Sequence, residues 1–149
     1  MKSVMRCLLT TALLLFGSRA VVAQTIKFTN GSGGTFTIAS AVAGQDPTSV
    51  SNGAGNFTTT TKNNQGVLRI RASLNQAMPV NTTLTLTLTY PTGANQGAQV
   101  LGITPVDMVV SIPAFQGNRT GTVTYSFAAT ASAGVVTPFS RTVTLTIGP

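Results

Sequence analysis

The segment TTLTLTLTY, residues 82–90, alternates threonine with leucine over almost its whole length. Successive side chains of a β-strand point to opposite faces of the sheet, so Leu84, Leu86, Leu88 and Tyr90 share one face. The opposite face receives threonine. This period of two, with β-branched residues outward, is typical of a strand that buries one face. The segment therefore predicts an antiparallel strand whose leucines enter the core.

The same alternation recurs through the rest of the chain. The final segment, residues 142–147, again sets threonine against Val143, Leu145 and Ile147. Turn sequences rich in glycine, asparagine and proline, such as Asn52-Gly53, separate such segments. The other expected strands are residues 26–28, 36–42, 56–61, 68–74, 100–103, 106–112 and 122–127. Seven to nine short strands without an amphipathic helix predict an all-β fold, an antiparallel two-sheet β-sandwich of the Ig-like kind.

The first 23 residues have the layout of a secretory signal peptide. Lys2 and Arg6 precede an apolar run over residues 8–16, and the sequence VVA at 21–23 offers small residues before a cleavage point. We therefore predict a signal-peptide helix over residues 1–23 and a single β-sandwich domain over residues 24–149. Cys7 falls in the leader, so the exported domain is expected to have no disulfide bond.

The leader predicts the location of the protein. We expect a secreted protein at the cell exterior or cell surface, with the periplasm as the alternative. No later apolar run approaches the length needed to span a bilayer, so no transmembrane segment is expected in the mature form.

The expected mature chain lacks most side chains on which enzymes depend. It contains no His, Cys, Glu or Trp, and its two acids are Asp46 and Asp107. General acid–base and nucleophilic catalysis work mainly through those residue types. The chain also lacks the Ser-x-x-Lys and Gly-x-Ser-x-Gly motifs of serine hydrolases. We therefore predict a protein that is not an enzyme and that uses no metal and no cofactor.

Charge is sparse in the expected mature chain. Six basic and two acidic residues give a formal net charge of +4, and the basic residues are not clustered among aromatics. Nucleic-acid partners are therefore not expected. The polar surface must come from uncharged residues, including 24 threonines after the leader. Such a neutral, hydroxyl-rich surface suits a protein that packs against copies of itself or a matrix, or it reflects the general composition of secreted proteins.

Four charged residues are candidates for a binding role. Arg69 and Arg71 fall on one strand face, where they would contact an anionic glycan, lipid headgroup or other anionic partner, or simply solubilise the outer face. Asp46 lies in a Gly-Gln-Asp-Pro turn and is expected to cap local backbone, with a cation ligand as the alternative. Asp107 is expected at the rim where a strand begins, with pairing to an arginine as the alternative.

The first expected strand has a second interpretation. It is a short alternating segment followed by the glycine-rich sequence Asn30-Gly31-Ser32-Gly33-Gly34. It is either the first strand of its own sheet or a donor strand that inserts into the edge of a neighbouring copy, and repeated insertion would build a fibre. The candidate donor residues are Thr25, Ile26, Lys27, Phe28 and Thr29.

The chain also resembles a known type of protein. The segments Ala77-Met78-Pro79, Thr83-Leu84-Thr85-Leu86, Val123-Thr124-Tyr125 and Arg141-Thr142-Val143-Thr144 resemble those of small secreted bacterial Ig-like β-sandwich proteins, similar in plan to surface-fibre subunits. The resemblance covers most of the mature chain and carries no functional motif. The paired cysteines of many chaperone–usher pilins are missing.

Two functions follow as expectations. The first is an exported, non-enzymatic structural or interaction protein, a self-assembling fibre or matrix subunit whose partners are copies of itself or cell-surface and matrix components. The alternative is a monomeric secreted binding module for glycans or another surface ligand, with Arg69 and Arg71 as its contacts.

Overall fold

The computed structural model describes residues 24–149, except residues 32, 40–41, 43, 62–65 and 115–116. The predicted signal peptide, residues 1–23, lies outside the described residues. The described part of the chain forms β-strands and one short 3-10 helix, η1 (Ala131–Ala133). The strands are β1 (Thr25–Asn30), β2 (Val50–Thr61), β3 (Leu68–Leu74), β4 (Thr82–Thr89), β5 (Ala94–Asn95), β6 (Ala98–Val100), β7 (Val106–Ile112), β8 (Gly117–Ala129) and β9 (Val143–Gly148).

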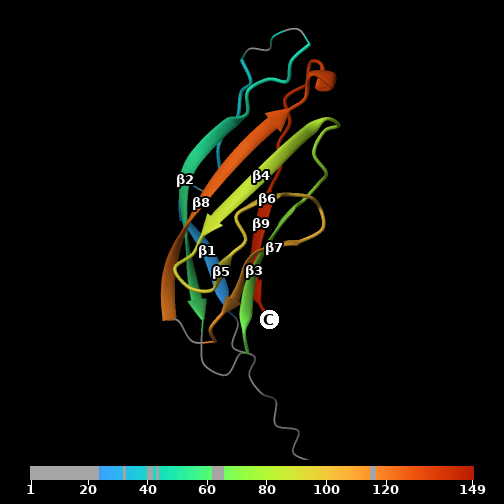
Figure 1. Ribbon diagram of the computed structural model, residues 1–149. Coiled ribbons are helices and arrows are strands. Elements are labelled where there is room, and N and C mark those ends of the chain that lie inside the picture. The colour runs from blue at the N-terminus through green and yellow to red at the C-terminus, as the bar shows by residue number, and fades with distance from the viewer. Residues whose placement is uncertain (1–23, 32, 40–41, 43, 62–65, 115–116) are drawn as a thin grey trace, which may run out of the picture.

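The strands form two antiparallel sheets, which confirms the predicted β-sandwich. One sheet has five strands in the order β1-β2-β8-β4-β6, and the other has four in the order β5-β7-β3-β9. Figure 1 shows the long strands β2, β8 and β4 side by side in one layer, with β7, β3 and β9 in the other. The first strand, β1, and the last, β9, are each at an edge of their sheet.

The chain changes sheets at almost every step. After β1 and β2, each successive strand from β3 to β9 belongs to the sheet opposite its predecessor. Long strands therefore pair with partners far away in the sequence, as β8 does with β2 and β4. Formation of either sheet thus requires contacts of high sequence separation, which favours slow folding.

The core lies between the inner faces of the two sheets and follows the predicted alternation. In β4 the side chains of Leu84, Leu86 and Leu88 are at most 7% exposed, and the threonines at 83 and 89 are exposed. Leu86 packs in one continuous cluster with apolar side chains from both sheets. The fully buried members of the core include Phe57, Leu68, Ile70, Met108, Val109, Ile112 and Val123.

Three boundary predictions were wrong. Residues 36–39 belong to no strand, although Phe36 and Ile38 still pack partly buried against the core. The end of that expected strand, residues 40–42, includes residues outside the described part. The expected turn at Asn52-Gly53 lies inside β2. The register of β2 with β8 shifts at this point, between Asn52 and Gly55. The expected strand at 100–103 ends as β6 at Val100.

A glycine in β8 makes room for Phe57, the largest fully buried side chain among the described residues. Gly121 lies directly opposite Phe57 of β2, and a methyl group at 121 would overlap the Phe57 ring. That ring stacks on Tyr90, with centroids 5.9 Å apart. The Tyr90 hydroxyl is 2.6 Å from the hydroxyl of buried Thr59. An aromatic ring over a cross-strand glycine fixes the register of the two strands.

Gly121→Ala should therefore destabilise the protein. The added methyl would force the Phe57 ring or the neighbouring backbone of β4 to move, at a cost of about 1–3 kcal/mol in the free energy of unfolding. Denaturant unfolding of the variant and of the wild type measures this difference. Gly102→Ala is the matched control, because a Cβ at Gly102 meets nothing within 4 Å. Equal stability of the two variants would contradict this packing.

Burial of Tyr125 predicts a loss of stability in alkali. Burial raises the pKa of the Tyr125 phenol above its ordinary value of 10.0. The folded state thus holds this proton more tightly, so stability present below pH 10 is lost as the pH rises beyond it, by at most about 1.4 kcal/mol per pH unit. Tyr125→Phe should unfold with a weaker dependence on pH above 10, measured by denaturant titration at several pH values. Identical slopes for the two proteins would exclude this contribution.

Candidate functional site

The first and last strands lie on the same flank of the sandwich and enclose a shallow groove. The groove has a volume of about 380 Å³ and is lined by residues of β1 and β9, from opposite sheets. Its apolar lining comes from Ile26, Leu145 and Ile147. Figure 1 shows β1 near the lower end of β9. Both sheets therefore end on this flank, where Ile26 and Ile147 remain only partly buried.

The candidate donor residues 25–29 are in a strand of their own chain. β1 pairs antiparallel with β2, with Ile26 opposite Thr59 and Phe28 opposite Phe57. Ile26 and Phe28 face the core and are partly buried, whereas Thr25, Lys27 and Thr29 are exposed. The sequence allowed two arrangements of this segment, pairing within its own sheet or donation to a neighbouring copy. In the structure of the single chain, the segment pairs within its own sheet.

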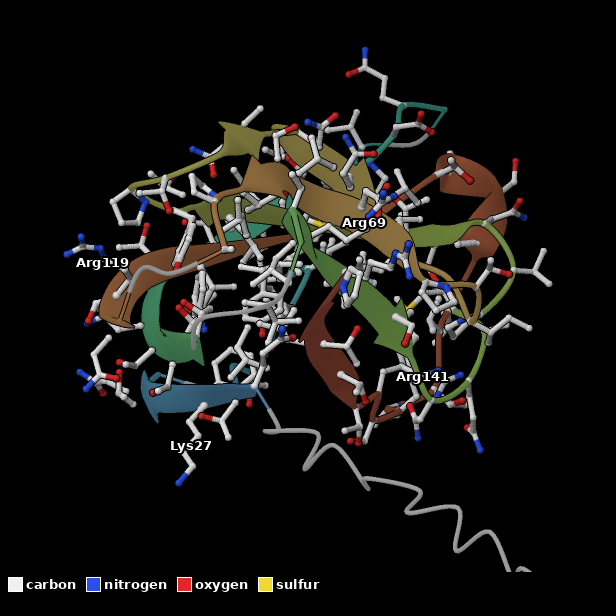
Figure 2. All side chains as sticks on the ribbon, turned by 90° about the horizontal axis from the view of Figure 1, so that it is seen from below. Lys27, Arg69, Arg119 and Arg141 are labelled. Atoms are coloured by element: carbon white, nitrogen blue, oxygen red, sulfur yellow. The ribbon has the colours of Figure 1, made fainter. Side chains whose placement is uncertain are left out.

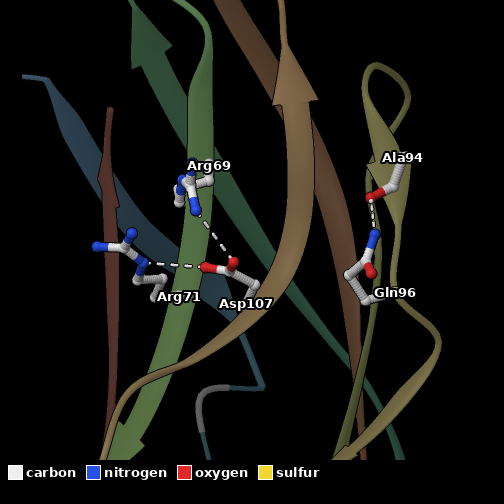
Figure 3. A network of polar contacts seen from close by, with 5 residues as sticks. All are labelled: Arg69, Arg71, Ala94, Gln96 and Asp107. Atoms are coloured by element: carbon white, nitrogen blue, oxygen red, sulfur yellow. Dashed lines mark hydrogen bonds and ion pairs between the residues drawn. The ribbon is translucent and has the colours of Figure 1, made fainter.

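Arg69 and Arg71 do not project freely into solvent. The Arg69 Nη1 atom lies 3.2 Å from Asp107 Oδ2, and the Arg71 Nε atom lies 2.9 Å from Asp107 Oδ1 (Figure 3). Of the two interpretations of Asp107, the structure shows pairing with arginine. All three side chains are 36–42% exposed, so each ion pair contributes at most about 1 kcal/mol to stability.

A β-bulge in β7 brings Asp107 to this face. Arg71 is opposite Asp107 and Ile70 is opposite Val109, so Met108 is an extra residue in the ladder. Met108 and Val109 are both fully buried. Without the bulge, alternation from Val109 would turn the Asp107 side chain toward the core. Pairing of Asp107 with an arginine was one of the alternatives from the sequence, but alternation alone could not identify Arg69 and Arg71 as the partners.

The cluster retains some capacity to bind an anion. One carboxylate faces two guanidinium groups, which leaves one formal positive charge on this face. The bonds to Asp107 use Nη1 of Arg69 and Nε of Arg71, so other N–H groups of both side chains remain available. The alternative function, a module for anionic ligands, therefore has a weaker basis than two unpaired arginines would provide.

Asp46 has a different partner from the one expected. Its Oδ1 accepts a hydrogen bond from the backbone N–H of Ala131 at 2.7 Å. That residue begins η1 and is 85 positions away in the sequence. The prediction that Asp46 caps local backbone was therefore wrong. Its carboxylate instead links residues 46–49 to η1, which follows the end of β8.

A larger hollow lies at one end of the sandwich. It has a volume of about 900 Å³ and lies between the non-strand segments 34–39 and 134–141. Phe36, Phe127 and Phe139 contribute rings to its walls, and the Arg141 guanidinium lies 5.0 Å from the centroid of the Phe139 ring. Arg141 is also anchored to the Ala77 carbonyl. This hollow was not predicted from the sequence, because residues 36–42 were expected to form a strand, whereas residues 34–39 lie outside the sheets and form one of its walls.

The described residues offer little else for metal or polyanion chemistry. No three His, Cys, Asp or Glu side chains gather among them. Figure 2 shows the labelled basic side chains Lys27, Arg69, Arg119 and Arg141 well separated around the molecule, with Lys27 pointing away from β1. In the part of the chain that the structure describes, no helix has the length and apolarity required to cross a bilayer.

Comparison of the chain with protein-family models, with curated proteins and with solved structures finds no match. The β-sandwich is therefore supported by the strand pairing of the described residues. The resemblance to surface-fibre subunits stays a prediction.

Removing the charge of Asp107 should strengthen binding to polyanions. Asp107→Asn would leave both guanidinium groups uncompensated, so we expect binding to heparin, used as a probe, to tighten by up to about five-fold at low salt. The effect should vanish toward 1 M salt because the Debye length falls to about 3 Å. Salt-dependent affinity chromatography measures both trends. Asp46→Asn is the matched control with the same change in net charge, and an equal gain in that variant would exclude a local role for the cluster.

Proposed function

We propose that the protein is an exported, non-enzymatic structural or interaction protein of the cell exterior, which self-assembles by exchanging β1 between copies. The observation that carries this proposal is the attachment of β1. It is a terminal edge strand that pairs with one neighbour, β2, and is followed by a glycine-rich segment in no strand. Such a strand can leave its own sheet and occupy the same position in another copy.

The cost of releasing β1 is modest. Its two inward side chains, Ile26 and Phe28, are only partly buried, and the others are exposed. Gly31 has a φ angle of 62°, and Gly33 and Gly34 follow it in an exposed, irregular segment. Glycine adopts such conformations readily, so this connection can change direction without the strain that other residues would incur.

The vacated position would be specific for β1. The edge of β2 presents Phe57 and Thr59, both fully buried in the folded chain. Thr59 is held by its hydrogen bond to Tyr90, and Phe57 is held by its stacking on the same ring. An incoming β1 that placed Phe28 opposite Phe57 would restore the strand pairing and the packing that release of the resident β1 breaks. Exchange therefore keeps the same contacts between β1 and β2, now formed between two chains. A high protein concentration favours the exchanged form.

The surface favours close approach of copies. The outer face of the five-stranded sheet carries hydroxyl side chains in register, such as Thr58 beside Thr120 at 3.5 Å and Ser51 beside Ser126 at 3.3 Å. With few charges overall, long-range repulsion between copies is weak. The scarcity of catalytic residue types supports a structural role, and the expected signal peptide supports export.

Exchange can be tested by cysteines placed on β1 and β2. Lys27 lies directly opposite Thr58 on the outer face, and opposite residues in antiparallel strands have Cα atoms about 4.5–5.5 Å apart, within disulfide range. When exported Lys27→Cys protein is mixed with exported Thr58→Cys protein and oxidised mildly, we expect covalent heterodimers, detected by non-reducing electrophoresis. β1 of one chain would then be paired with β2 of the other.

A double variant supplies the control. In Lys27→Cys/Thr58→Cys, a disulfide formed within one chain should fix β1 in its own sheet. The oxidised protein should then form no filaments by electron microscopy, and reduction should restore them. A mixture of Lys27→Cys with Thr124→Cys, whose cysteines do not meet in this register, should not cross-link. Absence of heterodimers in the first mixture, or filaments that persist in the locked protein, would refute β1 exchange.

A further inference from the structure

The two sheets have four edges, and three of them carry features that oppose pairing with another chain. β5 has two residues and β6 has three, which is too short to template a strand. β1 carries exposed Lys27, and its register with β2 shifts between Phe28 and Asn30. Short strands, charges and irregular register are the usual protections of sheet edges.

The fourth edge, β9, lacks these protections. It has six residues with the sequence VTLTIG, without charge and without proline. Its register with β3 runs without a shift from Val143 opposite Leu74 to Gly148 opposite Arg69. β9 is the last strand in the order of its sheet. A regular, uncharged edge of this length is ready to accept another strand.

The hydrogen bonds of Thr142 determine which backbone groups of β9 are free. The Asn75 N–H donates to the Thr142 carbonyl at 3.0 Å, and the Thr142 N–H donates to Asn75 Oδ1 at 2.8 Å. The backbone groups of Thr142 therefore face β3. Because this direction alternates along an antiparallel strand, those of Thr144 and Thr146 also face β3. The N–H and C=O groups of Val143, Leu145 and Ile147 face the open side, where no described strand pairs with them.

We propose that β9 pairs antiparallel with β9 of a second copy, with Leu145 opposite Leu145 about a two-fold axis. This register sets Val143 of each copy opposite Ile147 of the other. Each of these residues then exchanges both backbone hydrogen bonds with its counterpart, since these are the residues whose groups face outward. The two four-stranded sheets become one continuous sheet.

The side chains of β9 are self-complementary in this register. On the inner face Val143 and Ile147 are partly buried, so they would cover each other beside the groove shared with β1. On the outer face Thr144 of one copy lies opposite Thr146 of the other. β9 brings no charge to either face, so no like-charge contact opposes the pairing. A shift by one residue would set threonine against the apolar residues, which disfavours registers displaced by an odd number of residues.

This interface differs from the exchange of β1, because it requires no strand to leave its sheet. The two can be separated with the oxidised Lys27→Cys/Thr58→Cys protein, in which β1 is fixed within its chain. In that locked protein we expect a monomer–dimer equilibrium by analytical ultracentrifugation. If β1 exchange does not occur, this monomer–dimer equilibrium should still be observed. If the locked protein stays monomeric at all concentrations, the β9 proposal is overturned and the proposal of β1 exchange is not affected.

Charge exchange on the outer face tests the pairing directly. In the locked protein, Thr144→Lys/Thr146→Lys would place lysine opposite lysine, and Thr144→Glu/Thr146→Glu would place glutamate opposite glutamate. We expect the dimer dissociation constant of each variant to rise by at least about ten-fold from like charges in direct opposition. An equimolar mixture of the two should form a heterodimer tighter than either homodimer. Thr122→Lys/Thr124→Lys, exposed on the central strand β8, is the control and should dimerise like the wild type.

Cysteines on β9 test the register. A mixture of exported Thr144→Cys and Thr146→Cys proteins should form disulfide-linked heterodimers, whereas each protein alone should not, because neither residue faces its own copy in this register. Unchanged dimerisation of the lysine variant, an absence of heterodimer in the charge mixture, or cross-linking of either cysteine protein alone would each overturn the proposal. Cross-linking of Thr144→Cys to a cysteine at Lys27 of another copy would instead assign the edge to β1.

Discussion

Burial of alternating apolar side chains between two sheets is the interaction on which this structure depends. Neither sheet can cover its own inner face, so the side chains of Leu86 and Ile70 are buried only when the sheets stack. The described strands contain no cysteine, and the chain instead crosses between the sheets at nearly every step. These crossings tie the layers together, and the threonines opposite the core residues make the surface polar and almost free of charge.

Two stacked open sheets necessarily end in edges, and the edges are where this protein differs from a closed barrel. The first and last strands meet on one flank, where β1 pairs with one neighbour, β2, and β9 has backbone groups that no described strand pairs with. The same flank thus combines the strand that we propose is exchanged with the edge that we propose is extended. Backbone pairing between copies is the interaction that we propose for this flank.

The arginines of β3 illustrate how packing alters a charge pattern. In the sequence Arg69 and Arg71 form a basic stripe, but the extra residue Met108 in β7 turns Asp107 toward them. The bulge is accommodated because both Met108 and Val109 find space in the core. The resulting cluster keeps one formal positive charge, so it is a weaker basis for anion recognition than two unpaired arginines.

Alternation in the sequence was sufficient to predict which side chains face the core in β3, β4, β8 and β9, because the direction of a side chain along a strand is a local property with a period of two. It also predicted the two-sheet class and the short strand at residues 25–29. The position of β8 between β2 and β4, the packing of residues 36–39 outside any sheet, and the identity of the open flank emerged only from the folded chain. Strand order rests on backbone hydrogen bonds between distant segments, and every residue other than proline offers the same backbone groups, so alternation cannot distinguish one partner from another.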